Sequence, residues 1–246
     1  MNAFTFGDQA FLARAGTDYN TLWPVVVLGA NLILWHEASD YSAFANDHQI
    51  LPAETWLDRA QGLNAVPKAG SDATNRPVFK TNIFSTGQPA VHLDSTGAGF
   101  TSPGFSTNAC TIIAVTKNLT GRSELLGTNG FTRYYPARDA GPVRITYWNG
   151  GGDYVEVATP ANPLADAEAR VLVRSAGSVS FYVNRTAFAG GAVGATAILV
   201  DEIGSGSGGP TSKPDIGCII VSSGAITQAN YFSIYDNYLK PRFGLP

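Results

Sequence analysis

Residues 169–184 read ARVLVRSAGSVSFYVN, and this stretch decides the fold class. Apolar and polar residues alternate on both sides of residues 175–177, where a glycine indicates the turn of a hairpin. Side chains of a strand point alternately to two faces, so Val171 and Val173 share one face. The stretch therefore predicts two antiparallel strands joined by a tight turn.

The same kind of pattern recurs along most of the chain. Short β-type runs alternate with turn clusters rich in glycine, proline, serine and asparagine, a rhythm typical of a β-sandwich. Charged residues make up 14% of the 246 residues, well below the ~25% of an average soluble protein. The chain contains 27 glycines and 14 prolines. This composition indicates a turn-rich all-β protein with a polar but weakly charged surface.

Charge and hydropathy exclude several classes of partner. The net charge is −3 and no basic stripe is present, so we expect no nucleic acid partner. The first residues show no signal-peptide pattern. The most apolar run, residues 22–35, is shorter than the ~20 residues that span a bilayer, so we expect no membrane insertion. We interpret that run as two buried strands joined by a turn. Cys110 and Cys218 lie in apolar runs, as buried free thiols or as a disulfide between facing strands.

The last twenty residues change period. Apolar residues there fall at helical spacing along one face, namely Tyr231, Ile234, Tyr235, Tyr238 and Leu239. Thr227 is suited to cap such a helix, and Pro241 is expected to end it. We expect this helix to lie against the sandwich, with Tyr235 and Leu239 sealing one side. The predicted core comprises Trp35, Ile112, Ala114, Val171, Val173, Phe181, Val183, Ile219 and Val221.

The closing stretch IYDNYLKPRFGL resembles the ending of concanavalin-A-like (laminin-G-like) jelly-roll domains, which are common in virion proteins of tailed bacteriophages. The stretches LILWHEASD, TWLDRAQGLNAV and NRPVFKTNIFSTGQPAVHLD resemble earlier blocks of that family, in the same order. The resemblance implies an all-β, two-sheet antiparallel jelly-roll sandwich with a short C-terminal α-helix. It divides the chain into an N-terminal extension or docking arm, residues 1–30, and a jelly-roll domain, residues 31–246. One departure is His36-Glu37, where the family usually has Leu-Asp.

Some relatives on this fold hydrolyse glycans with two carboxylates that point from one strand into a cleft. No such string occurs in this sequence. Asp153 and Glu156 are three residues apart and should face opposite sides of a strand, and so should the adjacent Asp201 and Glu202. The three histidines also lack metal-ligand spacing. We therefore predict a protein that is not an enzyme.

Calcium is the one cofactor that the sequence leaves open. Calcium takes six to eight oxygen ligands, often from carboxylates in loops. The weak candidates are Asp40, Asp47, Asp58 and Asp94, which form no dense cluster. Asp58 and Asp94 can equally be turn formers that accept hydrogen bonds from nearby backbone amides.

Sugar recognition combines aromatic faces with amide and carboxylate hydrogen bonds. Two loop regions hold such residues, and they give the candidate glycan-binding set Tyr134, Tyr135, Trp148, Asn149 and Asp153. These residues are equally compatible with ordinary strand ends.

Together these features lead to a hypothesis and an alternative. The resemblance implies a non-enzymatic structural component on the virion surface, as a capsid decoration protein or a tail or fibre module. Residues 1–30 would dock onto other virion proteins, and a homo-oligomer is expected. The alternative is a carbohydrate-binding module that recognises a host or environmental glycan as a receptor. A glycan depolymerase ranks last, because no carboxylate pair is placed for it.

Overall fold

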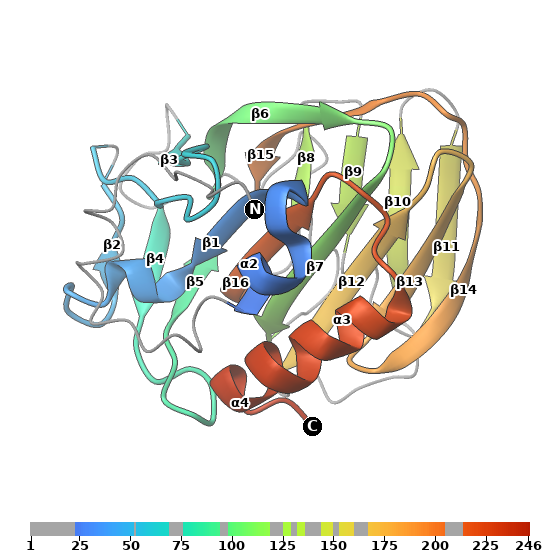
Figure 1. Cartoon of the computed structure of the whole chain (residues 1–246). Helices are drawn as coiled ribbons and strands as arrows, with labels where there is room; N and C mark the ends of the chain where they lie inside the picture. Colours follow the sequence, from blue (N-terminus) through green and yellow to red (C-terminus); the bar gives the residue numbers. More distant parts are fainter. Residues whose placement is uncertain are drawn as a thin grey trace, which may run out of the picture.

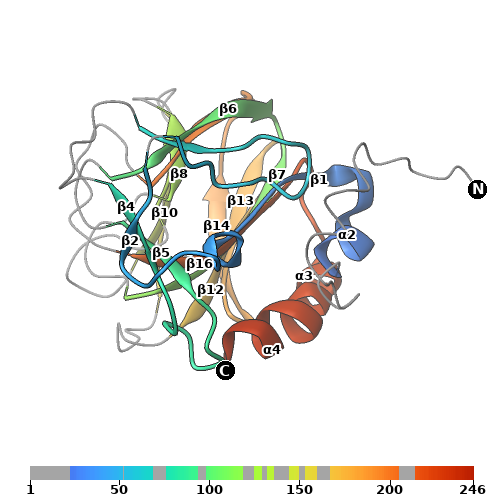
Figure 2. The ribbon, with the colours of Figure 1, turned by 90° about the vertical axis from the view of Figure 1, so that its left-hand side faces the viewer.

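The computed structural model describes residues 23–51, 53–68, 76–93, 98–118, 125–128, 132–135, 144–149, 153–159, 167–204 and 214–246. Two antiparallel sheets pack face to face as a sandwich, and helices cover the outer face of one of them (Figures 1 and 2). This is the all-β jelly-roll-like fold with a short C-terminal helix that the sequence predicts.

The larger sheet has nine strands in the described part of the chain. Its order is β14-β13-β12-β7-β16-β5-β4-β2, and β1 pairs with β16. The strands are β1 (Leu32–Glu37), β2 (His48–Gln49), β4 (Pro77–Lys80), β5 (Ala90–Leu93), β7 (Cys110–Lys117), β12 (Glu168–Arg174), β13 (Ser178–Val183), β14 (Thr186–Ala192) and β16 (Asp215–Ser222). The hairpin predicted from residues 169–184 is the β12–β13 pair, in which Leu172 lies opposite Phe181.

The smaller sheet has seven described strands in the order β11-β10-β9-β8-β15-β6-β3. They are β3 (Val66–Pro67), β6 (Phe100–Thr107), β8 (Leu126–Thr128), β9 (Thr132–Tyr135), β10 (Arg144–Asn149), β11 (Asp153–Ala158) and β15 (Ile198–Ile203). Each sheet contains both hairpins and long connections. As a result, strands that are distant in sequence, such as β8 and β15, pair with each other.

Two apolar layers hold the molecule together. The first lies between the sheets and contains the predicted core residues Ile112, Ala114, Phe181, Ile219 and Val221. The second lies between the nine-stranded sheet and the helices, and it contains Trp35, Val171, Tyr235 and Leu239. Val173 and Val183 are only partly buried. The helix therefore seals the outer face of one sheet, as predicted.

The C-terminal helix begins as predicted, because the Thr227 side chain accepts a hydrogen bond from the Asn230 amide. It comprises α3 (Gln228–Ile234), a π-helical turn η4 (Tyr235–Leu239) and α4 (Lys240–Phe243). The prediction that Pro241 ends the helix is wrong. The π-turn widens the helix directly before Pro241, which relieves the clash that a proline ring makes with the carbonyl four residues earlier. Gly244, with φ 66°, ends the helix instead.

Of the two buried strands predicted in residues 22–35, the first is wrong and the second is confirmed. Residues Trp23–Leu28 form helix α2, followed by the 3-10 turn η2 (Gly29–Asn31) and then strand β1. Leu28 is buried in the apolar layer under the C-terminal helix, and α2 lies beside α3 (Figure 2). Packing on α3 therefore overrides the strand propensity of the consecutive valines.

Cys110 and Cys218 are both free and buried. They belong to the two different apolar layers, on opposite faces of the nine-stranded sheet, so the disulfide alternative is excluded. None of the helices in the described ranges is long and apolar enough to cross a membrane.

Candidate functional site

The hairpin β10–β11 forms one edge of the seven-stranded sheet and carries an aromatic pair on its outer face. Trp148 on β10 lies directly opposite Tyr154 on β11. The preceding residue Tyr147 and the following residue Val155 belong to the core between the sheets. Because strand side chains alternate, Trp148 and Tyr154 point away from that core. Tyr154 is 49% exposed, and Trp148 is partly buried.

A carboxylate lies beside this aromatic pair. The Tyr154 hydroxyl donates a hydrogen bond to Glu156 Oε2 at 2.5 Å, and Thr146 Oγ1 donates to the same oxygen at 3.3 Å. These bonds hold the exposed tyrosine ring and the carboxylate in a fixed relation. An aromatic face next to a hydrogen-bond acceptor is an arrangement that can bind a sugar ring.

Asn149 and Asp153 lie opposite each other at the turn end of the hairpin. Asp153 Oδ2 accepts a hydrogen bond from the Gly194 amide at 2.9 Å, which ties the hairpin to the segment after β14. Asn149 is buried. Both residues are thus near the aromatic pair in the sheet, but they belong to the opposite face of the hairpin.

Tyr134 is 2% exposed and lies in the core between the sheets, opposite Tyr147. Burial raises the pKa of its hydroxyl. This ring is part of the core and not of an exposed loop, because the alternation of β9 directs it inward. The Tyr135 backbone pairs with Thr146, and its side chain lies outside the described part of the structure.

The register of the β10–β11 hairpin also determines which face of the sheet each of its carboxylates occupies. Glu156 shares the outer face with Tyr154, whereas Asp153 shares the inner face with Val155. A glycosidase needs two carboxyl groups on either side of one bond. Asp153 and Glu156 point to opposite faces, as predicted, so they cannot act as such a pair.

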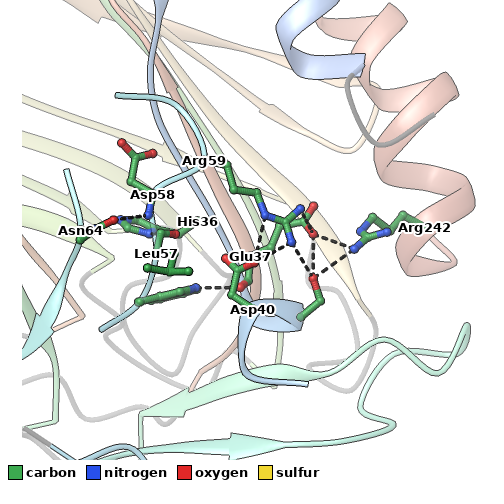
Figure 3. Close-up of polar contacts among 10 residues, drawn as sticks. His36, Glu37, Asp40, Leu57, Asp58, Arg59, Asn64 and Arg242 are labelled. Atoms are coloured by element: carbon green, nitrogen blue, oxygen red, sulfur yellow. Dashed lines mark hydrogen bonds and ion pairs between the residues drawn. The ribbon is translucent and has the colours of Figure 1, made fainter. Parts of the chain in front are cut away.

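A second polar cluster lies where the C-terminal helix meets strand β1 and the 3-10 turn η3 (Ala38–Tyr41). Figure 3 shows the side chains of Arg59 and Arg242 directed at Glu37. Glu37 Oε2 accepts from Arg59 Nη1 at 2.7 Å and from Arg242 Nη2 at 2.6 Å. Arg59 also donates to Asp40 Oδ1, from Nε at 3.0 Å and Nη2 at 2.7 Å. Two carboxylates and two guanidinium groups therefore pair in a partly buried network, in which Glu37 is the buried member.

Two of the calcium candidates, Asp40 in this network and Asp58 beside it, already have partners within the protein. Burial raises the pKa of Asp40, and the neighbouring Arg59 opposes that shift. Asp58 accepts hydrogen bonds from four backbone amides, those of Trp35, Ala60, Gln61 and Leu63, at 2.7 to 3.0 Å. Asp58 thus has the turn-forming role that the sequence offered as the alternative.

Of the remaining candidates, Asp47 is exposed in a turn with φ 58°, and Asp94 lies outside the described residues. Within the described ranges, no group of three or more histidine, cysteine, aspartate or glutamate side chains could hold a metal ion.

His36 lies beside this cluster and is fully buried against Trp56. Its Nδ1 is 2.8 Å from the Leu57 carbonyl oxygen, so Nδ1 carries the proton and donates. Burial lowers the pKa of His36 to about 4, although the Leu57 hydrogen bond and the Asp58 charge act in the opposite direction. The ring is therefore neutral in the folded protein at pH 7.

Sequence reasoning left Tyr154 and Glu156 out of the glycan-binding set, although it named Glu156 among the carboxylates, and it missed the Glu37 network. The alternation in DYVEVA already places Tyr154 and Glu156 on one face, and the hairpin turn before it would pair Tyr154 with Trp148. The departure at His36-Glu37 was the signal for the network, because a glutamate that ends an apolar strand needs buried partners.

Comparisons with known proteins agree on the fold. No family model and no curated protein matches the sequence. The ligand-binding domain of botulinum neurotoxin serotype D, solved with N-acetylneuraminic acid, is similar at 11% identity and a TM-score of 0.62. That match covers 91% of this chain and 56% of the neurotoxin chain, so this chain spans about half of its neighbour's length.

Two further solved structures are similar. Domain 4 of the extracellular arabinanase AbnA from Geobacillus stearothermophilus, solved with arabinotriose, has 13% identity and a TM-score of 0.50, and the match covers 84% of this chain and 98% of that one. The sialidase of Trypanosoma rangeli, solved as a covalent intermediate with 2,3-difluorosialic acid, has 15% identity and a TM-score of 0.51, with 85% and 33% covered. At these identities the likeness shows a shared β-sandwich fold.

Proposed function

We propose that this chain is a non-enzymatic carbohydrate-binding module whose ligand packs against Tyr154 and Trp148. The observation that carries this proposal is the aromatic pair on the outer face of β10–β11, with the Glu156 carboxylate fixed beside it. Sugar rings pack with their C–H faces on aromatic rings, and their hydroxyl groups donate to carboxylates. The sugar ligands of the neurotoxin and arabinanase domains, which share the fold, support this choice of ligand class.

The proposal contains no catalytic step, because the two carboxylates of the hairpin point to opposite faces. Binding sites for sugars need no acid and base, only a platform and hydrogen-bond partners. The function proposed is recognition of a glycan, with receptor recognition as the biological use.

A glycan array tests this proposal with the whole chain, in the presence and absence of calcium. We expect selective binding to at least one glycan, lost in Tyr154→Ala and retained in Thr186→Ala. Thr186 is an exposed residue on β14 of the other sheet, so it controls for nonspecific effects of surface substitution. An array without signal in both conditions, or binding that Tyr154→Ala leaves unchanged, would overturn the proposal.

We further propose that this module is carried on the surface of a tailed-bacteriophage particle, as a capsid decoration protein or a tail or fibre module. Residues 1–30 would attach a homo-oligomer of the chain to other virion proteins. The family resemblance of the closing stretch motivates this, together with the place of α2 outside the sandwich, where Val26 is 67% exposed.

The attachment is tested by deleting residues 1–22, a boundary that keeps the buried Leu28 and the contact between α2 and α3. We expect a folded module with unchanged melting that no longer joins particles during assembly. Incorporation of the truncated protein at the level of the full chain would contradict a docking role for residues 1–22.

A further inference from the structure

We infer that the nine-stranded sheet fixes the glycan-binding hairpin β10–β11 from its inner side, and that Asp153 and Gly191 act as positioning residues for the glycan. Two contacts, which together we call the clasp, carry this inference: a hydrogen bond at Asp153 and a close approach at Gly191. The inference rests on the proposed function and deepens it. Asp153, which the sequence placed in the glycan-binding set, then supports the site from below and does not contact the sugar.

The hairpin needs such support because β11 is the edge strand of the seven-stranded sheet. Among the described strands, β11 pairs with β10 alone. Tyr154 therefore belongs to a strand that backbone hydrogen bonds to other strands hold on one side only. A platform binds its ligand more tightly when its rings are fixed before the ligand arrives, because less conformational freedom is lost on binding.

The edge strand of the nine-stranded sheet, β14, lies against β11. A Cβ atom on Gly191 of β14 would lie 3.2 and 3.3 Å from the two methyl groups of Val155. These distances are shorter than ordinary van der Waals contact, so the two edge strands approach this closely because position 191 has no side chain. Val155 directly follows Tyr154 and is buried between the sheets. Position 191 therefore helps to set where β11 lies.

A hydrogen bond completes the clasp at the turn end of the hairpin. The Gly194 amide, just after β14, donates to Asp153 Oδ2 at 2.9 Å. Asp153 and its partner Asn149 come directly beyond the aromatic pair in the hairpin. A hydrogen bond to an ionised carboxylate is stronger than one between neutral groups. The bond at Asp153 therefore holds the strand ends that carry the two aromatic rings.

Arg174 on β12 of the nine-stranded sheet holds the segment that donates this bond. Its side chain is buried, and Nη2 donates to the carbonyl oxygens of Gly194 at 2.9 Å and Thr196 at 2.6 Å. Nη1 donates to the Asn108 carbonyl oxygen. The guanidinium carbon also lies 5.8 Å from the centre of the Tyr147 ring, on the inner face of β10. Arg174 thus contacts both the segment after β14 and the hairpin itself.

Variants that leave the aromatic pair intact test the bond at Asp153. Affinity electrophoresis of the whole chain, in gels that contain arabinan, xylan or galactomannan, identifies a retained polysaccharide. If none is retained, the strongest glycan of the array serves as the probe. We expect Asp153→Ala to weaken binding about threefold to tenfold, because it removes the bond from the Gly194 amide. Asp153→Asn should retain most of the affinity, because its amide oxygen still accepts that bond.

Gly191→Val tests the close approach of the two edge strands. The added side chain meets the Val155 methyl groups and should displace β11, with a loss of affinity of about threefold or more. Gly177→Val is the matched control and should bind as the wild type does, because a Cβ atom on Gly177 would meet nothing within 4 Å. Neither substitution removes a group of the proposed site. If Gly191→Val does not fold, Gly191→Ala must still bind more weakly than Gly177→Ala.

An NMR measurement on the ligand-free protein separates positioning from a general loss of stability. Nitrogen-15 relaxation dispersion of the Trp148 indole N–H signal detects exchange of the aromatic pair between conformations. We expect exchange in folded Asp153→Ala and Gly191→Val, and none in Asp153→Asn or Gly177→Val. Weakened binding without such exchange would overturn the positioning role.

The outcomes separate this inference from the proposed function. If Tyr154→Ala abolishes binding while Asp153→Ala or Gly191→Val binds like the wild type, the positioning role of that residue is overturned and the proposed function stands. If Asp153→Asn loses as much affinity as Asp153→Ala, Asp153 acts through its charge on the sugar, and its positioning role is overturned. If the wild-type chain binds no polysaccharide and no array glycan, both fail.

Discussion

The two outer faces of the sandwich are built in opposite ways. The outer face of the nine-stranded sheet carries Trp35, Ile113, Val171 and Ile220, and the C-terminal helix covers it. The outer face of the seven-stranded sheet carries exposed residues such as Tyr154 and Thr101. The helices cover the first face, whereas side chains such as Tyr154 and Thr101 stay exposed on the second.

The strands of the two sheets differ accordingly. Every residue of β16 is buried, because one face packs on the other sheet and the opposite face packs on the helices. In β11 the residues of one face are exposed or partly exposed, and Val155 on the other is buried. A continuous apolar strand therefore indicates a sheet covered on both sides, and an alternating strand indicates a sheet open on one side.

The largest effect is expected on the covered face. Leu239→Asp places a charge in the apolar layer beneath the helix and should lower the free energy of unfolding by several kcal/mol. Urea unfolding of the purified variant measures this. If that variant does not fold, Leu239→Ala should still cost ~2–5 kcal/mol. Near-unchanged melting of both variants would refute the helix docking.

The next effect concerns the ion network that ties α4 to β1. Arg242→Ala leaves the buried Glu37 carboxylate with Arg59 as its remaining guanidinium partner. Removing one partner of a buried pair typically costs ~3–5 kcal/mol, and because Arg242 is partly exposed we expect about 2–3 kcal/mol. Lys240→Ala, on the same helix but exposed, is the control and should cost less than about 0.5 kcal/mol. Equal effects of the two substitutions would show that the network contributes nothing specific.

A smaller effect should appear as a pH dependence. The pKa of His36 is about 4 in the folded protein, against an ordinary value of 6.5 for an exposed histidine, so the unfolded chain binds the proton first on acidification. The contribution of neutral His36 to the free energy of unfolding is complete above pH 6.5. It is lost as the pH falls toward 4, by up to ~3 kcal/mol. The raised pKa of Asp40 opposes this change, because its protonation favours the folded state.

His36→Gln isolates the contribution of the histidine. The unfolding free energy of the wild type minus that of the variant should decrease steadily as the pH falls from 6.5 to 4. A difference that stays constant over that range would contradict a neutral, buried His36.

The smallest effect on stability is expected on the outer face of the seven-stranded sheet. Tyr154→Ala removes an exposed ring and one hydrogen bond, and it should change the free energy of unfolding by less than about 0.5 kcal/mol. The same substitution should abolish glycan binding. Loss of both stability and binding would mean that Tyr154 is structural.

The sequence predicted the fold because its signals are local and repeated. The alternation around residues 175–177 and the helical spacing from Tyr231 to Leu239 correspond to β12–β13 and α3–η4. The predictions were wrong where tertiary packing or an unusual turn determines the local structure. Packing on α3 makes a helix of Trp23–Leu28, and a π-turn lets the helix pass Pro241.

The site was only partly predictable. Trp148 was identified by its place at a strand end, and alternation would have added Tyr154 and Glu156. Tyr134 lies inside because the face of β9 that it occupies depends on pairing with β10, and single-strand patterns do not reveal which face meets the other sheet. The partners of Glu37 come from residues 59 and 242, a long-range contact with no local signal.

The central claim is that a glycan binds on the outer face of β10–β11. The chain has four tryptophans, and Trp35 and Trp56 are buried. A nitrogen-15 NMR titration of the indole N–H signals with the array-selected glycan tests the claim most directly. We predict that the Trp148 signal shifts with saturation while those of Trp35 and Trp56 stay in place. An unmoved Trp148 signal at saturating glycan would contradict the account.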